Sequence, residues 1–288
     1  MEWARAKSII ILLLFAMNIF LASRLLMEYG NQGLSREAVA DMADILASRG
    51  VEITCKVPLY EKDTPRLEFG NGVFDIDVQV ERLLGFKLTS DSRFTGTELV
   101  FENGVRKLTF IGPNSFEYRN PEPGDDVNIG NIFDAEKYLK RFLKEKKLSS
   151  SAYVLDGEPE AATDSVIFNY VEKYKGFLVF DNKIRAVVTG KGVTLLEMSH
   201  RSITGFSPDT IKNISTAYQV MLENFDGSEK TVVTEITAGY KEAGTEEENE
   251  LKSSDQLPVW RIKVNGRYRF FGATDGKEII DSKGKNAP

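Results

Sequence analysis

The sequence predicts an α+β protein in which one N-terminal transmembrane helix precedes extracytoplasmic antiparallel sheets with packed helices. Three observations lead to this fold class. Residues 8–23 form an uncharged apolar run, three later segments show amphipathic helical spacing, and much of the remaining chain alternates between apolar and polar residues around glycine-containing turns. The 288 residues are enough for one or two domains with their own cores.

The apolar run has the flanks of a membrane anchor. It follows Arg5 and Lys7, and it reaches 20 residues over 8–27 if the Arg24 side chain extends to the membrane surface. Trp3 suits the interfacial aromatic belt. The positive-inside rule then places the residues before the run in the cytoplasm and everything after it outside the cell membrane.

A cleaved signal peptide is the alternative interpretation of this run. The best cleavage position follows Ser23, where Leu21 stands at the third position before the cut although a small residue is preferred there. We therefore expect an uncleaved signal anchor.

One face of the anchor helix combines polar, small and bulky side chains at helical spacing. This face consists of Ser8, Ile11, Phe15, Asn18, Ala22 and Leu25. Small residues allow helices to approach closely, and an amide facing lipid is costly, so we expect this face to contact a partner helix. The alternative is that one asparagine is tolerated off-centre in the span, or that its amide bonds to its own helix backbone.

The first part of the body predicts a helix, a strand and a hairpin. "LSREAVADMADILASRG" has Ser35 as N-cap and Gly50 as the end of the helix. "VEITCKV", residues 51–57, alternates like a half-buried strand. In "TELVFENGVRKLTFIG", Asn103 and Gly104 predict the tight turn of a hairpin.

A second helix follows the loop "RNPEPGDD", which predicts a domain boundary near residue 124. The helix spans 131–147, with Asp134 as its cap. The side chains expected to face inward are Phe133, Tyr138, Leu139, Phe142 and Leu143. The other side is basic and carries Lys137, Lys140, Arg141, Lys144, Lys146 and Lys147. Such a surface is typical of a solvated face; the alternative is contact with an anionic wall polymer or lipid.

The C-terminal half predicts two similar units, each a helix followed by three or four strands. The first has strands at 165–174, 176–180, 183–190 and 193–199, with turns at Asp181–Asn182 and Gly190–Gly192. The second has a helix at 207–225 and strands at 230–242, 257–265, 267–273 and 277–281. The expected organisation is a tail (1–7), an anchor (8–27), an N-terminal domain (28–124) and a C-terminal domain (125–288) with repeats at about 131–205 and 206–281.

Composition and spacing give no support for an enzyme. The net charge of −6 argues against nucleic-acid binding, and one cysteine with one histidine cannot form an internal disulfide or a Cys/His zinc site. His200 lies in "EMSHRS" without a nucleophile elbow, and Asp75 and Asp77 lack a second convergent acid. We expect no catalytic, cofactor-binding or metal-binding residues, and Cys55 is expected in the core.

The N-terminus "MEWARAKSIIILLLFAMNIFLASRLL" resembles the start of YycI-type (WalI) proteins, which open with an acid and a tryptophan, a basic pair and an apolar span. The C-terminal "PVWRIKVNGRYRFFGATDGKEI" is similar to PepSY-type modules. The long acidic loop at residues 244–256 departs from the YycI-type pattern. The first resemblance implies a regulator related to YycH that acts with a YycH-like companion on a membrane sensor histidine kinase controlling cell-wall metabolism.

The lead hypothesis is therefore a non-enzymatic, single-span regulator that contacts the kinase and its companion, as a homodimer or heterodimer. The second hypothesis is an anchored module that binds a peptide or a cell-wall fragment. The third is an anchored hydrolase, which would require convergent acids or a nucleophile in a pocket.

Overall fold

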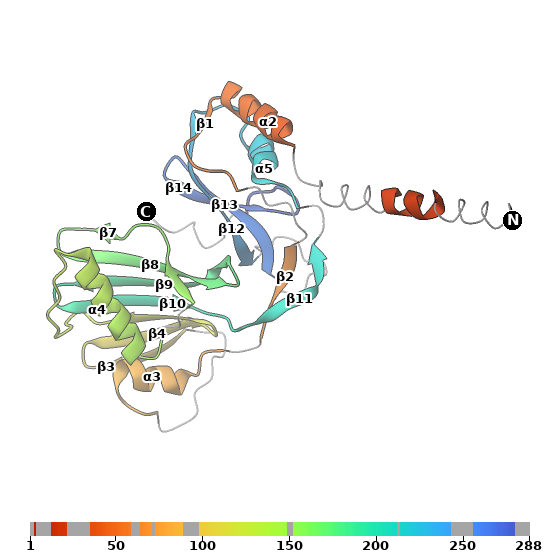
Figure 1. Ribbon diagram of the computed structural model, residues 1–288. Coiled ribbons are helices and arrows are strands. Elements are labelled where there is room, and N and C mark those ends of the chain that lie inside the picture. The colour runs from red at the N-terminus through yellow and green to blue at the C-terminus, as the bar shows by residue number, and fades with distance from the viewer. Residues whose placement is uncertain are drawn as a thin grey trace.

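The computed structural model describes residues 3, 13–21, 35–58, 64–70, 73–88, 98–148, 152–211, 214–242 and 256–279. Within these residues, one large and mostly antiparallel sheet carries helices α2 to α5 (Figure 1). The predicted α+β class is confirmed in this form.

Four helices of the body alternate with strands of very different length. The helices are α2 (Arg36–Ser48), α3 (Ile76–Leu84), α4 (Ile132–Glu145) and α5 (Ala217–Asn224). The first seven strands are β1 (Val51–Ile53), β2 (Thr64–Phe69), β3 (Leu99–Asn103), β4 (Arg106–Gly112), β5 (Ser115–Arg119), β6 (Tyr153–Leu155) and β7 (Glu160–Ala161). The others are β8 (Ser165–Tyr174), β9 (Phe177–Thr189), β10 (Gly192–Ser199), β11 (Ile203–Ile211), β12 (Thr231–Glu242), β13 (Gln256–Val264) and β14 (Arg267–Gly272).

The strands of the described residues follow the order β11-β2-β13-β12-β9-β10-β5-β4-β3. Strand β14 pairs with β13, β8 pairs with β9, and β6 and β7 pair with β8. Two pairings are parallel, β1 with β12 and β12 with β9. The sheet therefore joins segments that are distant in sequence.

Two lobes meet in this sheet. The α4 lobe, residues 73–199, packs α3 and α4 on one face of the sheet around a core that includes Phe110, Phe116 and Phe168. The α5 lobe, residues 35–70 and 203–279, packs α2 and α5 around a core that includes Trp260. In each lobe, the sheet face that packs against the helices is apolar because alternate residues of the strands point inward.

The lobes are joined where the first residues of β9 in the α4 lobe pair with β12 of the α5 lobe. Only Gly239 and Tyr240 of β12 pair with β9, opposite Leu178 and Val179. Two small clusters of buried apolar residues pack around this pairing. The Tyr240 hydroxyl also donates a hydrogen bond of 2.5 Å to the carbonyl of Pro65. We call this region the junction.

Of two predicted helix caps, one is confirmed and one is wrong. In α2, Ser35 is the N-cap as predicted and accepts from the amide of Ala38 at 3.1 Å. In α4, the predicted cap Asp134 is wrong, because the Asn131 side chain accepts from the amide of Phe133 at 3.0 Å. The helix therefore starts early and turns Phe133 outward, where 81% of it is exposed, contrary to the expected inward position.

The turn predicted at Asp181–Asn182 is wrong, because both residues lie inside β9. Asn182 is buried, and its amide donates to Glu172 Oε2 at 2.6 Å and to the carbonyl of Arg201 at 2.8 Å. The chain instead reverses at Lys175–Gly176, whose φ angles are +46° and +99°. The two strands predicted at 176–180 and 183–190 thus form one.

The hairpin between β3 and β4 is confirmed, but its turn lies one residue later than predicted. Asn103 pairs with Arg106, so Gly104 and Val105 are the central residues and only Gly104 has a positive φ, of 61°. The Asn103 side chain is held in the strand because it donates to the carbonyl of Leu84 at 2.9 Å.

The helix predicted over 207–225 is wrong in its first part, where β11 extends to Ile211. Helix α5 starts only after Thr216, which forms a capping box with Gln219. The division of the chain at residue 124 and the two repeats stay predictions; strands β5 and β10, which lie on either side of residue 124, pair in one sheet.

Candidate interaction site

The segment Leu13–Leu21 is a helix whose apolar side chains point to solvent on every side. The exposed fractions of its large apolar residues run from 49% at Leu21 to 67% at Phe15. Figure 1 shows this helix outside the folded body. Single exposed apolar residues are normal, but a contiguous apolar surface marks contact with another protein or a membrane. We call this segment the apolar helix.

The predicted contact face lies partly on the apolar helix. Of its members, Phe15 and Asn18 are described and exposed. The other members, and all but one of the predicted flanking residues, lie outside the described residues: Ser8, Ile11, Ala22, Leu25, Arg5, Lys7 and Arg24. The flanking Trp3 is described and exposed. The contact face therefore stays a prediction.

Asn18 forms the hydrogen bond that the alternative interpretation required. Its Nδ2 donates to the carbonyl of Leu14, one turn earlier, at 2.9 Å. An amide that bonds its own backbone can lie in an apolar environment at lower cost than a free one.

Within the described residues, no helix is long and apolar enough to cross a membrane. Of the span predicted at 8–27, residues 13–21 are described and the remainder lies outside the described part of the chain.

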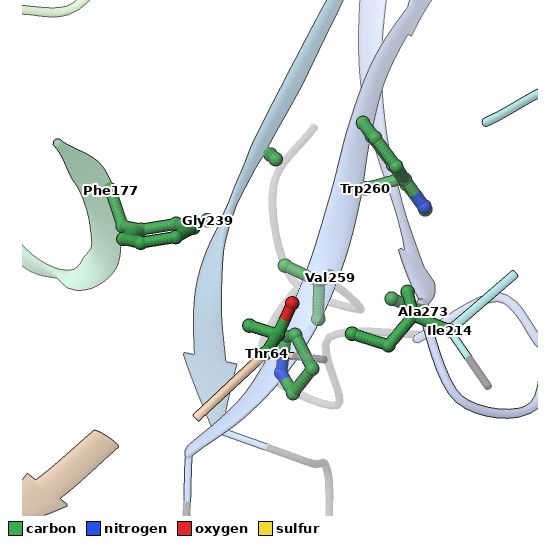
Figure 2. A pocket seen from close by; sticks show the side chains of 9 residues that line it. Thr64, Phe177, Ile214, Gly239, Val259, Trp260 and Ala273 are labelled. Carbon is green, nitrogen blue, oxygen red and sulfur yellow. The ribbon is translucent and has the colours of Figure 1, made fainter. Parts of the chain in front are cut away.

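The cavity in Figure 2 lies between the α5 lobe and Phe177 of the α4 lobe and is too small for a ligand. Its volume is about 10 Å³, which matches a single water molecule. Nine residues line it, among them Phe177, Val259 and Trp260, and most of the lining atoms are apolar (Figure 2). Ligand sites usually have volumes of about 300–1,000 Å³.

A larger, open hollow of about 570 Å³ lies at the end of the β13–β14 hairpin. Its lining is mostly polar and charged, and consists of Glu229, Thr231, Val264, Asn265, Arg267, Tyr268 and Arg269. Its volume is in the range of ligand sites, but it lacks the apolar walls that are typical of them.

His200 lies beside a buried polar network at the junction. Its Nδ1 is 3.4 Å from Glu172 Oε2 and 3.1 Å from the Tyr153 hydroxyl. Burial, together with the charge of Glu172, raises the pKa of Tyr153, so this hydroxyl stays protonated and is not a nucleophile. His200, which directly follows β10, thus contacts side chains of β6 and β8.

The acidic residues considered for catalysis have structural positions. Asp75 is the N-cap of α3 and accepts from the amide of Val78 at 3.1 Å, and Asp77 lies in the first helical turn. Among the described residues, no group of three or more His, Cys, Asp or Glu side chains could hold a metal ion.

Sequence reasoning missed a buried charged cluster around Arg261. Arg261 of β13 is 4% exposed, and its Nη1 donates to both oxygens of Asp156, at 2.7 and 2.8 Å. Its Nη2 donates to Glu235 Oε1 at 3.0 Å. The guanidinium also lies over the rings of Phe180, at 4.7 Å, and Tyr268, at 4.3 Å. Asp156 and Phe180 belong to the α4 lobe, so this cluster connects the two lobes.

The charges of this cluster change the ionisation of its members. Burial by itself would raise the pKa of Glu235, but hydrogen bonds from Tyr268 and Arg261 and the positive charge of Arg261 outweigh it and lower the pKa. Burial and the hydrogen bond to Glu235 raise the pKa of Tyr268 to about 12. At neutral pH Glu235 is therefore ionised and Tyr268 is protonated, and these ionisation states favour the hydrogen bonds of the cluster.

The model of the family described as YycI protein matches residues 31–274 of this chain. The chain belongs to the YycI family. The match begins after the predicted span, so it rests on the body and not on the N-terminal residues that carry the resemblance. Membership of the YycI family indicates a regulator of a two-component system.

Among solved structures, the C-terminal domain of YpeB from Bacillus megaterium is similar to this YycI-family chain. The two share 13% sequence identity with a TM-score of 0.38, over 70% of this chain and 92% of that chain. No curated protein matches the chain.

Proposed function

We propose that this YycI-family chain is a membrane-anchored, extracytoplasmic regulator of a sensor histidine kinase that controls cell-wall metabolism. Residues 8–27 cross the membrane, with residues 1–7 in the cytoplasm and the body outside. The basic residues Arg5 and Lys7 before the apolar run support this orientation. The chain acts without catalysis, through contacts with the kinase and a YycH-like companion.

The observation that carries this proposal is the exposed apolar surface of residues 13–21. Seven large apolar residues on one short helix need a membrane or a protein partner. The body, in contrast, has a closed core, and the cavity of Figure 2 is too small for a substrate.

The mechanism is a shift in population between two kinase states. A regulator changes this equilibrium only if it binds one state more tightly than the other. The helix face with Phe15 and Asn18 provides such a contact. A kinase helix packs closely against this face in one of the two kinase states, so binding favours that state.

Removing the Asn18 amide, or moving it to another side of the helix, tests the helix contact. In Asn18→Leu, co-purification of the kinase from membranes is expected to weaken about 3- to 10-fold, because an interhelical hydrogen bond contributes roughly 0.6–1.5 kcal/mol. The matched control is Leu13→Asn/Asn18→Leu, which keeps the composition but places the amide about 140° away around the helix.

A kinase-dependent reporter gene provides the second readout. Both variants are expected to change its output, and a Phe20→Leu variant on the other side of the helix is expected to leave it unchanged. If Asn18→Leu binds the kinase and signals like the wild type, the assignment of this face is wrong.

The open hollow at the β13–β14 hairpin favours a second candidate function, an anchored module that binds a peptide or a cell-wall fragment. Its volume would accept such a ligand. A rise in unfolding temperature with purified wall peptides, removed by Arg267→Ala, would favour this function over the first.

A further inference from the structure

The outer surface of α4 carries an unusual combination of side chains. Phe133, Lys137, Lys140, Arg141 and Lys144 are all exposed. At 3.6 residues per turn they lie within an arc of about 100° around the helix, so they form one stripe. We call these five residues the α4 stripe.

The positive charges of the α4 stripe are only partly neutralised. Lys140 pairs with Glu136 at 2.6 Å and Arg141 pairs with Glu145 at 4.0 Å. Within the described part of the chain, Lys137 and Lys144 form no ion pair. The stripe is therefore positive on a chain whose net charge is −6.

The positive surface continues beyond the C-terminal end of α4. Lys147 is exposed, and Arg82 of α3 donates to its carbonyl at 3.4 Å. These charges lie within a Debye length of their neighbours in physiological salt, so their attraction for an anionic surface adds together.

Phe133 distinguishes between the possible anionic partners. It is 81% exposed, the highest value among the exposed large apolar residues of the described chain. It is held in this position because the Asn131 side chain caps the helix at the Phe133 amide. A hydrated polymer offers the ring no apolar environment, whereas the boundary between lipid headgroups and acyl chains does.

We propose that the α4 stripe docks on an anionic phospholipid surface, with the basic side chains against the headgroup phosphates and the Phe133 ring inserted below them. Figure 1 shows α4 lying across strands β8 to β10 with no labelled element over it. This contact goes beyond the proposed function, and it rests on it in one respect, because the anchor keeps α4 close to the membrane.

The test uses the full chain in vesicles of phosphatidylcholine, alone or mixed with phosphatidylglycerol. In a Cys55→Ser background, Phe133→Cys carries an apolar fluorophore, and lipids with brominated acyl chains quench it on contact. Quenching is expected with phosphatidylglycerol, and it should decrease at high salt. The variant Lys137→Gln/Lys140→Gln/Lys144→Gln should lower the ratio of docked to free α4 by about 10- to 100-fold.

The matched control is Lys107→Gln/Lys173→Gln/Lys183→Gln, which removes the same charge from exposed positions outside α4 and should leave quenching unchanged. Equal quenching in both lipid mixtures, or an equal loss in both triple variants, would overturn the proposal. So would displacement of the fluorophore from lipid by a soluble glycerol-phosphate polymer. Carbonate extraction reports on the anchor separately: a chain released by carbonate but quenched by phosphatidylglycerol would refute the anchor alone.

Discussion

Replacing Arg261 by methionine tests how much the charged cluster stabilises the junction. Methionine keeps much of the volume and the apolar stem of arginine but removes its charge. The change deletes three hydrogen bonds to carboxylates and the contacts with the rings of Phe180 and Tyr268. It leaves Asp156 and Glu235 without their cation in a region that water reaches only in part.

The expected loss of stability is about 3 kcal/mol. Removing one partner of a buried ion pair costs roughly 3–5 kcal/mol. The lower value applies here, because the side chains of Asp156 and Glu235 are 23% and 37% exposed and can regain some hydration. The Arg261 Nε is buried without a hydrogen-bond partner, and its removal offsets a further part of the loss.

Urea unfolding of the full chain in detergent, followed by the fluorescence of the buried Trp260, measures this loss. A decrease of 3 kcal/mol corresponds to a midpoint about 1 M lower in urea. The matched control is Arg185→Met. Arg185 pairs with Glu197 at 3.0 Å, but the two side chains are 44% and 41% exposed, so we expect a loss below about 1 kcal/mol.

The effect of Arg261→Met is also expected to depend on pH. The pKa of Glu235 is lowered in the folded protein, so this residue contributes stability above its ordinary pKa of 4.5, and the contribution disappears as the pH falls through the lowered value. Without Arg261 the pKa rises, and the stability difference between wild type and variant should narrow below about pH 4.5. The reasoning fails if Arg261→Met costs no more than Arg185→Met, or if the difference is the same at pH 3.5 and pH 7.

Two further substitutions test the junction and a helix cap. Gly239→Ala should lower the free energy of unfolding by about 2 kcal/mol. The added Cβ would lie 2.5 Å from the carbonyl oxygen of Leu178 and 2.5 Å from the ring of Phe180. An unchanged urea midpoint would show that β9 and β12 can separate freely. Thr216→Ala should lower the free energy of unfolding by about 1 kcal/mol, because α5 loses its capping box. Thr216→Ser keeps the hydroxyl and should retain most of this stability. Equal losses in the two variants would exclude the cap as the cause.

Local signals in the sequence predicted the elements whose causes are local. Ser35 identified the start of α2, and alternation identified the hairpin of β3 and β4. The signals failed where distant residues decide. Asn182 resembles a turn residue, but Glu172 and the carbonyl of Arg201 satisfy it inside a strand. No property of the segment around Asn182 indicates these partners.

The candidate site could be predicted only in part for the same reason. The apolar run is visible from the sequence alone, and its segment 13–21 is helical and exposed; the partner contact of its face stays a prediction. The bond from Asn18 to Leu14 is also local and was among the alternatives predicted for this amide. The pair of Arg261 and Asp156 is separated by 105 residues, so it becomes visible only when the order of the strands is known.

The position of β2 has a consequence for how the chain folds during synthesis. This strand lies between β11 and β13, and β1 lies beside β12, so the strand partners described for β1 and β2 all come from residues 203–264. An emerging chain must hold these early strands unpaired until nearly all of it has been made. Such non-local pairing slows folding and exposes strand edges to other chains. Apart from the short pairing of β9 with β12, the strands of the α4 lobe find their partners within residues 99–199, so this lobe can close first and serve as the surface on which the α5 lobe is completed.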